Sequence, residues 1–288
     1  MKIALGTVQF GLPYGIANSQ GQVSHDEVGR ILAYAQQRGV DTLDTAIAYG
    51  NSEQRLGEIG AQSWRVISKL PALPEDCIDV DAWVSSSVQG SIQRLNCNSL
   101  YGLLLHRPQN LLEGKGEQLY GAMQRLKHEG LVAKIGVSIY DPSELDGLCS
   151  RYRLDMVQAP FNLMDRRLID SGWMVQLKKQ DTELHVRSVF LQGLLLMSAS
   201  DRPSKFGRWR LLWAKYDAWL KDADMSPLQA CIGFAMFFSE ISKVVIGVDS
   251  LSQLKEILHA ADSGMPLVPE DIQSSDIELL NPARWNQL

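Results

Sequence analysis

The sequence predicts an α/β fold in which eight parallel strands close into a (β/α)8 TIM barrel, with residues 1–288 as a single domain. Strand-like and helix-like segments alternate from one end of the chain to the other, which is typical of βα units around a parallel sheet. Eight such units fit a chain of 288 residues. No linker or low-complexity segment marks a boundary between two domains.

The first half of the chain carries four predicted βα units. Its strands are Ile3–Thr7, Thr42–Thr45, Arg65–Lys69 and Tyr101–Leu105, and its helices run from Ser24 to Gly39 and over Ser52–Ile59, Asp81–Leu95 and Gly116–Glu129. The first helix begins with a capping box between Ser24 and Glu27 and ends at Gly39. The fourth strand is apolar throughout, as expected for a strand that is covered on both faces.

The second half carries the other four units. Its predicted strands are Lys134–Val137, Met156–Gln158, His185–Val189 and Lys243–Ile246. The first predicted helix of this half starts at Asp141 and Pro142, and the second covers Arg166–Lys179. A further helix runs from Ser226 to Phe238, and the last begins at Ser250 with a capping box to Gln253. A longer loop, Gln192–Gly207, precedes an additional tryptophan-rich helix around Trp209–Leu220.

The composition is that of a globular protein with a sizeable core, because 45% of the residues are hydrophobic and 21% are charged. The formal net charge is −5, and no run of lysine and arginine with interleaved aromatics is present. We therefore expect neither nucleic acid nor a membrane surface as a partner. The most apolar stretch, Leu228–Val248, is interrupted by Glu240 and Lys243, so it predicts a buried helix and strand.

Four cysteines are spread over the chain: Cys77, Cys97, Cys149 and Cys231. They form no CxxC pair, and no histidine stands near them at metal-ligand spacing. The chain enters its first strand directly after Met1, without an apolar signal core. These features predict reduced structural thiols, no metal site and a cytoplasmic location.

Polar residues stand at the ends of three consecutive predicted strands. Asp44 lies at the end of the second strand and Tyr49 in the loop after it, while Lys69 ends the third strand and His106 follows the fourth. In a barrel the C-terminal ends of the strands meet at one rim, where the chemistry takes place. Each residue also has a structural interpretation when taken alone. Asp44 is a typical cap or the partner of Lys69 in an ion pair, and a loop tyrosine often covers core.

At these residues the chain resembles the aldo-keto reductase family, whose Asp, Tyr, Lys and His tetrad occupies the same strand ends. The motif Asp-Thr-Ala-x-x-Tyr-Gly-x-Ser-Glu begins at Asp44, and Ser68-Lys69 and Leu105-His106 follow in the family's order. The resemblance covers nearly the whole chain. It implies an NAD(P)H-dependent oxidoreductase that reduces an aldehyde, ketone or keto-sugar to an alcohol.

Each residue type suits a step of carbonyl reduction. Tyr49 is the expected general acid, which delivers a proton to the substrate oxygen as hydride reaches the carbon. A phenol with a pKa of ~10 is a weak acid, so we expect Lys69 to stabilise the phenolate and Asp44 to hold Lys69. A neutral His106 is expected to donate a hydrogen bond to the carbonyl and orient it. Tyr49 and His106 are therefore also predicted to bind substrate.

No Rossmann glycine fingerprint and no GxxxxGK loop is present for a cofactor. Barrel enzymes often bind phosphate near strands seven and eight, at a helix N-terminus whose N–H groups and dipole favour anions. The segment that fits this description contains Ile246, Gly247, Val248, Asp249, Ser250 and Gln253. Apart from the resemblance, an ordinary turn and helix cap explain this segment equally well.

The resemblance implies further contacts at the nicotinamide end. The matching cofactor-binding residues are Asp44, Ser138 and Gln158 beside the nicotinamide and Ser188, Leu191 and Gly193 along the pyrophosphate. Two positions depart from the family pattern, because Ile139 replaces a common asparagine and Arg187 replaces the tyrosine that commonly stacks on the nicotinamide. A guanidinium plane also stacks on aromatic rings, so Arg187 is a candidate for the same role.

A third departure concerns the choice of cofactor. Family members commonly bind the 2′-phosphate of NADPH through lysine or arginine, but this segment offers only Lys255, with Ile257 where an asparagine is often found. Asp249 disfavours a phosphate and is able to bond a ribose hydroxyl. NADP(H) is therefore the default from the family, and NAD(H) or dual use is the alternative.

Three loops are expected to cover the rim and bind a small carbonyl substrate: Phe10–Ile16, Arg107–Glu113 and Gln192–Arg210. Phe10 and Tyr14, and in addition Trp209, are candidates to stack on the substrate. Four cations in or beside these loops, namely Arg107, Lys205, Arg208 and Arg210, suit an anionic carbonyl compound, although a solvated surface explains most of them. The sequence identifies neither the substrate nor the oligomeric state.

Two other functions remain open at this stage. The first is a reductase-like subunit that binds nicotinamide cofactor and has a regulatory or scaffold role without turnover. The paired Tyr49 and Lys69 argue against it, because a non-catalytic descendant needs neither. The second is a lyase or isomerase that uses Lys69 as a Schiff base, for which Tyr49 and His106 offer no support.

Overall fold

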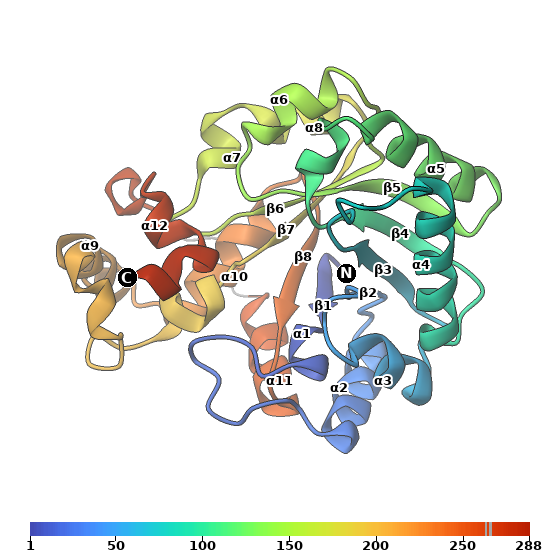
Figure 1. The fold of residues 1–288 in the computed structure, drawn as a ribbon. Coiled ribbons are helices and arrows are strands. Elements are labelled where there is room, and N and C mark those ends of the chain that lie inside the picture. The colour runs from blue at the N-terminus through green and yellow to red at the C-terminus, as the bar shows by residue number, and fades with distance from the viewer. Residues whose placement is uncertain (263, 265–266) are drawn as a thin grey trace.

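The computed structural model describes residues 1–262, 264 and 267–288 and contains the predicted closed barrel. Its strands are β1 (Ile3–Gly6), β2 (Thr42–Asp44), β3 (Arg65–Leu70), β4 (Leu100–Leu105), β5 (Val132–Ser138), β6 (Met156–Pro160), β7 (Glu183–Arg187) and β8 (Ile241–Gly247). Each strand pairs in parallel with its neighbours, and β1 closes the sheet by pairing with β8, where Gly6 lies opposite Gly247 (Figure 1). The (β/α)8 prediction is thus confirmed.

The helices surround the barrel (Figure 1). They are α1 (Val8–Gly11), α2 (His25–Gln37), α3 (Ser52–Ile59), α4 (Val80–Leu95), α5 (Gly116–His128), α6 (Glu144–Cys149), α7 (Arg167–Asp170), α8 (Trp173–Lys179), α9 (Arg210–Asp222), α10 (Pro227–Phe237), α11 (Leu251–Ala260) and α12 (Ile277–Leu280). Five short 3-10 helices complete the described elements: η1 (Pro108–Leu111), η2 (Leu191–Leu196), η3 (Ser204–Trp209), η4 (Glu270–Ile272) and η5 (Pro282–Gln287).

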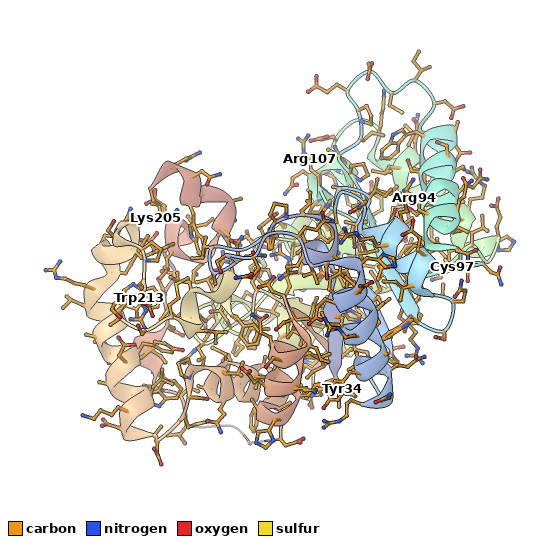
Figure 2. The ribbon with its side chains drawn as sticks, turned by 90° about the horizontal axis from the view of Figure 1, so that it is seen from below. Tyr34, Arg94, Cys97, Arg107, Lys205 and Trp213 are labelled. Atoms are coloured by element: carbon orange, nitrogen blue, oxygen red, sulfur yellow. The ribbon has the colours of Figure 1, made fainter. Side chains whose placement is uncertain are left out.

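The tryptophan-rich helix α9 lies at one side of the molecule together with α12 (Figure 1), and Figure 2 shows its Trp213 far from Arg94 and Cys97. Two tryptophan side chains connect this region to the C-terminal segment. Trp209, at the end of η3, donates from Nε1 to Asp276 at 2.9 Å, and Trp219 of α9 donates from Nε1 to the Leu267 carbonyl at 3.1 Å. No helix in the described part of the chain combines the length and apolar character that a membrane span requires.

Three predicted elements differ from the structure for local reasons. The helix predicted over Arg166–Lys179 is divided into α7 and α8, because Gly172 adopts a φ of +76°. Asp141 does not cap a helix. Its carboxylate accepts from the Ser143 N–H at 2.9 Å within a turn, and α6 begins at Glu144. The seventh strand ends at Arg187, before the predicted Val189, because Ser188 has a φ of +61°.

The core has two parts. The larger part packs between the barrel and its helices, and the smaller part fills the barrel interior with Ile67, Leu104 and Met156. Residues two apart on a strand face the same side of the sheet. The next inward positions on two of these strands, nearer the C-terminal rim, carry polar side chains. Lys69 follows Ile67 in this way, and Gln158 follows Met156. The interior is therefore apolar in the middle and polar at the rim.

Candidate active site

The loop that carries Tyr49 is held by backbone contact and by hydroxyl groups. Gly11 of α1 lies so close that a Cβ at this position would come within 1.8 Å of the Tyr49 carbonyl oxygen. Ser52 Oγ donates to the Thr7 carbonyl at 2.9 Å and accepts from Thr45 Oγ1 at 3.2 Å. These contacts join β1, β2 and α3, so they fix the position of Tyr49 relative to the strand ends.

Lys69 and Asp44 form a buried ion pair at the rim. Lys69 Nζ donates to Asp44 Oδ1 at 2.6 Å and to the Thr45 carbonyl at 2.9 Å, and its side chain is 0% exposed. Burial lowers the pKa of Lys69, and the nearby Asp44 carboxylate opposes this by raising it. An unpaired buried charge is costly, so each member of the pair requires the other.

Tyr49 and His106 meet edge to face, with ring centroids 5.7 Å apart and an interplanar angle of 66°. Lys69 Nζ lies 5.2 Å from the centroid of the Tyr49 ring. Burial and then the Asp44 charge raise the pKa of Tyr49, so the phenol is protonated and holds a proton to donate. Burial and then the Lys69 charge lower the pKa of His106 to about 4, so this imidazole is neutral near pH 7.

A chain of hydrogen bonds extends from this tetrad across the rim. Gln158 Nε2 donates to Asp44 Oδ2 at 2.7 Å, and Ser138 Oγ donates to Gln158 Oε1 at 3.0 Å. All three side chains are buried and line the same pocket. The two residues expected beside the nicotinamide are therefore oriented by the carboxylate that also holds Lys69.

The pocket has a volume of about 560 Å³, within the range of ~300–1,000 Å³ that is usual for ligand sites. It runs from Asp44, Tyr49 and His106, here called the catalytic end, to Asn18, Asp249, Gln253 and Glu256, here called the α11 end. The two ends are far apart, because β4 precedes His106 and β8 precedes Asp249, and these strands lie opposite one another in the closed barrel.

Carboxylates are concentrated at the α11 end. Asp249 accepts from Asn18 Nδ2 at 3.0 Å, and burial raises the pKa of this carboxyl group. The helix N-terminus itself is occupied, because the Leu251 N–H donates to Glu27 Oε1 at 2.6 Å and the Gln253 N–H donates to Ser250 Oγ at 3.2 Å. The only cation expected here, Lys255, lies outside the pocket lining with its Nζ 5.3 Å from the Tyr34 ring centroid.

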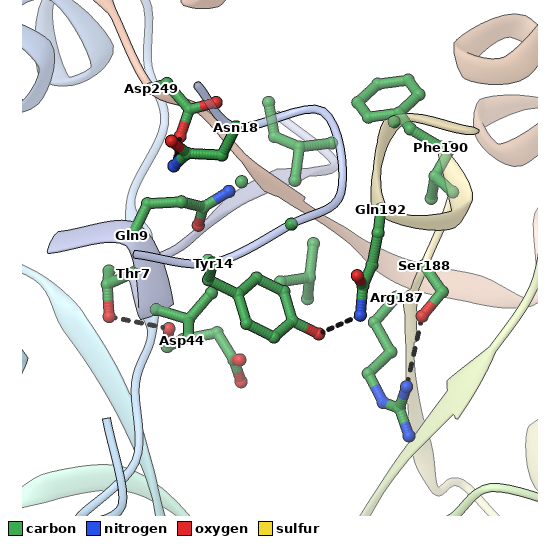
Figure 3. A pocket seen from close by; sticks show the side chains of 18 of the residues that line it. Thr7, Gln9, Tyr14, Asn18, Asp44, Arg187, Ser188, Phe190, Gln192 and Asp249 are labelled. Carbon is green, nitrogen blue, oxygen red and sulfur yellow. Dashed lines mark hydrogen bonds between the residues drawn. The ribbon is translucent and has the colours of Figure 1, made fainter. Parts of the chain in front are cut away.

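The segment after β7 borders the middle of the pocket and has an unusual backbone. Ser188, Leu191 and Gln192 have φ values of +61°, +47° and +54°, which residues other than glycine rarely adopt. Gly193 follows at +89°, and a Cβ there would lie 2.5 Å from the Ala17 Cβ. Across the pocket, Gln192 Nε2 donates to the Tyr14 hydroxyl at 3.0 Å (Figure 3). Strained conformations of this kind cluster at ligand sites.

Arg187 ends β7 and reaches towards the end of β5. Its guanidinium carbon lies 4.6 Å from the centroid of the Tyr140 ring, and its Nη2 donates to the Ile139 carbonyl at 2.9 Å. Its Nη1 donates to Ser188 Oγ at 3.2 Å (Figure 3). The side chain thus stacks on an aromatic ring of the protein itself.

Several predicted site residues lie elsewhere. Phe10 is 0% exposed and packs in the core, so it is unable to stack on a substrate. Leu191, Val248 and Ser250 do not line the pocket, and Lys69 lies behind its wall. By contrast, the pocket is lined by the remaining predicted residues: Asp44, Tyr49, His106, Ser138, Gln158, Arg187, Ser188, Gly193, Ile246, Gly247, Asp249, Gln253 and Tyr14.

Four of the other aromatic and cationic loop residues are engaged with the protein, whereas Arg210, the first residue of α9, does not line the pocket. Trp209 binds Asp276, and Arg208 pairs with Asp276 and Glu278. Lys205 Nζ donates to the Trp285 carbonyl at 2.9 Å, and Arg107 pairs with Glu113 at 2.8 Å. None of these four residues lines the pocket.

Sequence reasoning missed Gln9, Asn18, Tyr140 and Glu256, all of which line the pocket. Gln9 lies in the short helix α1, and its side chain points into the pocket (Figure 3). Its buried Oε1 has no hydrogen-bond partner among the described residues, so it offers an acceptor to a bound ligand. This free acceptor and the length of the pocket suit an extended ligand such as a dinucleotide.

The comparisons with known proteins agree with the fold. Residues 2–277 match the model of the Aldo/keto reductase family. An uncharacterized oxidoreductase of Bacillus subtilis (strain 168) is 22% identical in an alignment of 265 positions, which covers 85% of this chain and 85% of the other. Among solved structures, the holo form of an aldo-keto reductase from Bacillus halodurans superposes with a TM-score of 0.74 at 17% identity, covering 98% of this chain and 95% of the other. A glycerol dehydrogenase from Gluconobacter oxydans gives 0.70 at 20% identity, covering 98% and 92%.

Proposed function

The chain belongs to the aldo-keto reductase family and is an oxidoreductase, and we propose that it reduces an aldehyde, ketone or keto-sugar to the alcohol through Tyr49, Lys69, Asp44 and His106. The observation that carries this proposal is the buried Lys69–Asp44 pair at 2.6 Å directly beside a protonated Tyr49 in the wall of the pocket. A structural ion pair has no need of a phenol and a neutral imidazole next to it.

In this mechanism a nicotinamide cofactor, when bound, would be the source of the hydride for the carbonyl carbon. Tyr49 supplies the proton to the carbonyl oxygen, and the alcohol leaves. Lys69 lies close enough to the Tyr49 ring to stabilise the phenolate that remains, and Asp44 keeps Lys69 charged and in place. His106 is neutral, so it donates a hydrogen bond that orients the carbonyl and stabilises the developing alkoxide. Ser138 and Gln158 would hold the carboxamide of the cofactor.

We further infer that NADH is preferred to NADPH. Asp249 and Glu256 place two carboxylates in the pocket at the α11 end, with Glu27 nearby in an ion pair with Arg30, while Lys255 lies against Tyr34. The carboxylate of Glu27 already occupies the N-terminal N–H of α11, where a phosphate would otherwise bind. A ribose hydroxyl can donate to Asp249, whereas a 2′-phosphate is repelled by it. We place the enzyme in the cytoplasm, where its four free cysteines stay reduced.

A comparison of wild type with Tyr49→Phe over a panel of carbonyl compounds tests the main proposal. We expect kcat to fall by about 10³-fold, because the proton donor is lost, while the affinity for NADH measured by fluorescence stays the same. Equal turnover by both proteins would exclude Tyr49 as the acid. Cofactor binding without turnover of any compound by wild type would favour the regulatory subunit.

A further inference from the structure

Arg187 is a charged group in the pocket that the proposed chemistry does not use. Its guanidinium is held in one orientation by the Ile139 carbonyl at 2.9 Å, the Ser188 hydroxyl at 3.2 Å and the face of Tyr140 at 4.6 Å. A guanidinium has five N–H groups, of which two make these bonds. The remaining N–H groups are available to a ligand in the pocket.

The charge of Arg187 has no counter-ion in the described part of the chain. Lys69 is paired with Asp44, and two arginines of the rim loops, Arg107 and Arg208, are paired with glutamate or aspartate. Of the carboxylates that line the pocket, Asp44 is engaged with Lys69, and Asp249 and Glu256 stand at the α11 end. An unpaired cation that is partly removed from water is costly, and an anion that binds beside it removes that cost.

The guanidinium also lies within electrostatic reach of the reacting groups. Its positive charge lowers the pKa values of Tyr49, His106 and Lys69, although burial is the larger influence on each. Arg187 and Tyr14 extend into the same hollow from opposite walls (Figure 3). An anionic group bound at Arg187 would therefore bring the rest of a small molecule next to Tyr49 and His106.

We propose that Arg187 binds the anionic group of the substrate, so that the preferred substrates are carbonyl compounds that carry a carboxylate or a phosphate. The planar fork of a guanidinium matches the oxygen spacing of both groups. Tyr140 covers one face of the guanidinium, and the N–H edge is the part that recognises the anion. This inference rests on the proposed reductase function, and it identifies the substrate class. The anionic group itself is unchanged by the reaction.

Two pairs of aldehydes that differ in charge test the proposal with NADH. The carboxylate pair is 4-formylbenzoate and 4-formylbenzamide, and the phosphate pair is glyceraldehyde 3-phosphate and glyceraldehyde. In wild type we expect kcat/KM to be at least about tenfold higher for the anionic member of one pair, since hydrogen bonds to charged groups have this magnitude. The pair that shows the preference identifies the anion.

Three variants connect the preference to Arg187. Arg187→Gln should bring the ratio of kcat/KM values close to one, mainly by lowering the value for the anionic member. Arg187→Lys keeps the charge but not the fork, so it should retain part of the preference. Arg107→Gln removes a rim charge that is already paired with Glu113, so it should leave the ratio unchanged.

Three results would overturn the proposal: a wild type that prefers the neutral members, an unchanged ratio in Arg187→Gln, or a loss of NADH affinity in that variant without a change in ratio. The last result would assign Arg187 to the cofactor. Tyr49→Phe keeps Arg187, so calorimetric titration of its NADH complex should still show tighter binding of 4-formylbenzoate than of 4-formylbenzamide. If wild type reduces none of the aldehydes, the reductase function fails, and the same titration of wild type and Arg187→Gln still decides the role of Arg187.

Discussion

The two ends of the pocket are built in different ways. At the catalytic end, Asp44 and Lys69 belong to strands, are nearly inaccessible to solvent and are joined by a 2.6 Å ion pair. At the α11 end, Asp249 and Asn18 lie in loops, are only partly buried and are joined by a 3.0 Å hydrogen bond. The contrast indicates that the barrel strands fix the ion pair that supports Tyr49, whereas loop side chains form the α11 end, where we infer that the cofactor is selected.

The sign of the charge also differs between the ends. At the catalytic end Asp44 neutralises Lys69, which leaves the charge of Arg187 without a counter-ion among the described residues, while the α11 end contains Asp249 and Glu256. An anion is favoured at the first end and disfavoured at the second. A cofactor without a 2′-phosphate and a substrate with an anionic group satisfy both conditions.

The largest expected effect concerns the stability of the catalytic end. Lys69→Met leaves Asp44 buried with Gln158 as its remaining side-chain partner, so the free energy of unfolding should fall by about 3 kcal/mol. The double variant Asp44→Asn/Lys69→Met removes both charges and should recover most of that loss without recovering activity. Urea denaturation measures the free energy of unfolding, and NADH oxidation measures the activity.

The matched measurement at the α11 end is Asp249→Asn, which should change the free energy of unfolding by less than about 0.5 kcal/mol. Equal destabilisation by Lys69→Met and Asp249→Asn would remove the distinction between a strand-built and a loop-built end. No recovery in the double variant would mean that packing of the lysine side chain, and not its charge, stabilises the rim.

The second effect is a pH dependence of the free energy of unfolding, and it comes from His106. Its pKa is about 4 in the folded protein against an ordinary value of 6.5, so between these values the unfolded state binds a proton that the folded state does not. Stability from this group is therefore complete above pH 6.5 and is lost as the pH falls towards 4. We expect a loss of about 2 kcal/mol after allowance for partial exposure.

Urea denaturation at several pH values, with His106→Gln as the control, isolates this contribution. The variant should lack the extra loss of stability between pH 6.5 and 4 that wild type shows. An identical slope in both proteins would show that His106 titrates normally, and the neutral hydrogen-bond donor of the proposed mechanism would then be protonated in mild acid.

The smallest expected effect concerns cofactor choice at the α11 end. Asp249→Asn removes one of the carboxylates near a bound 2′-phosphate, so the Kd for NADPH should fall about tenfold relative to that for NADH. Fluorescence titration with both cofactors measures the ratio, and Glu240→Gln, at the opposite end of β8, serves as a control for net charge. An unchanged ratio, or a wild type that already prefers NADPH, would contradict the inferred use of NADH.

Much of the fold was predictable because local signals agreed with the final structure. Alternation of strands and helices, the cap at Ser24 and the apolar strand ending at Leu105 predicted elements that the barrel contains. The errors in the end of the seventh strand and in the helix over Arg166–Lys179 came from residues with positive φ angles that the sequence pattern did not predict. Ser188 adopts a positive φ without being a glycine, and Gly172 divides a helix that its apolar pattern predicted as continuous.

The site was predictable to the extent that it depends on strand ends. Asp44, Tyr49 and His106 line one pocket and Lys69 lies behind them, as expected from their positions along the chain, while their catalytic roles stay predictions. Phe10 was predicted in a loop over the rim, but it lies in the short helix α1, and its residue type alone does not distinguish a core position from a substrate contact. Gln9 of the same helix and Asn18 were missed for a related reason, since an isolated amide side chain belongs to no motif.

Sequence alone determined the barrel, the tetrad and their order, because strand periodicity and short motifs are local properties of the chain. Only the tertiary structure decided which charges are neutralised. Glu27 accepts a hydrogen bond at the N-terminus of α11 from a position more than two hundred residues away in sequence. Arg187 stacks on Tyr140 and forms no ion pair with a carboxylate of the described residues. Electrostatic pairing depends on distances in space, and these exist only once the barrel has closed.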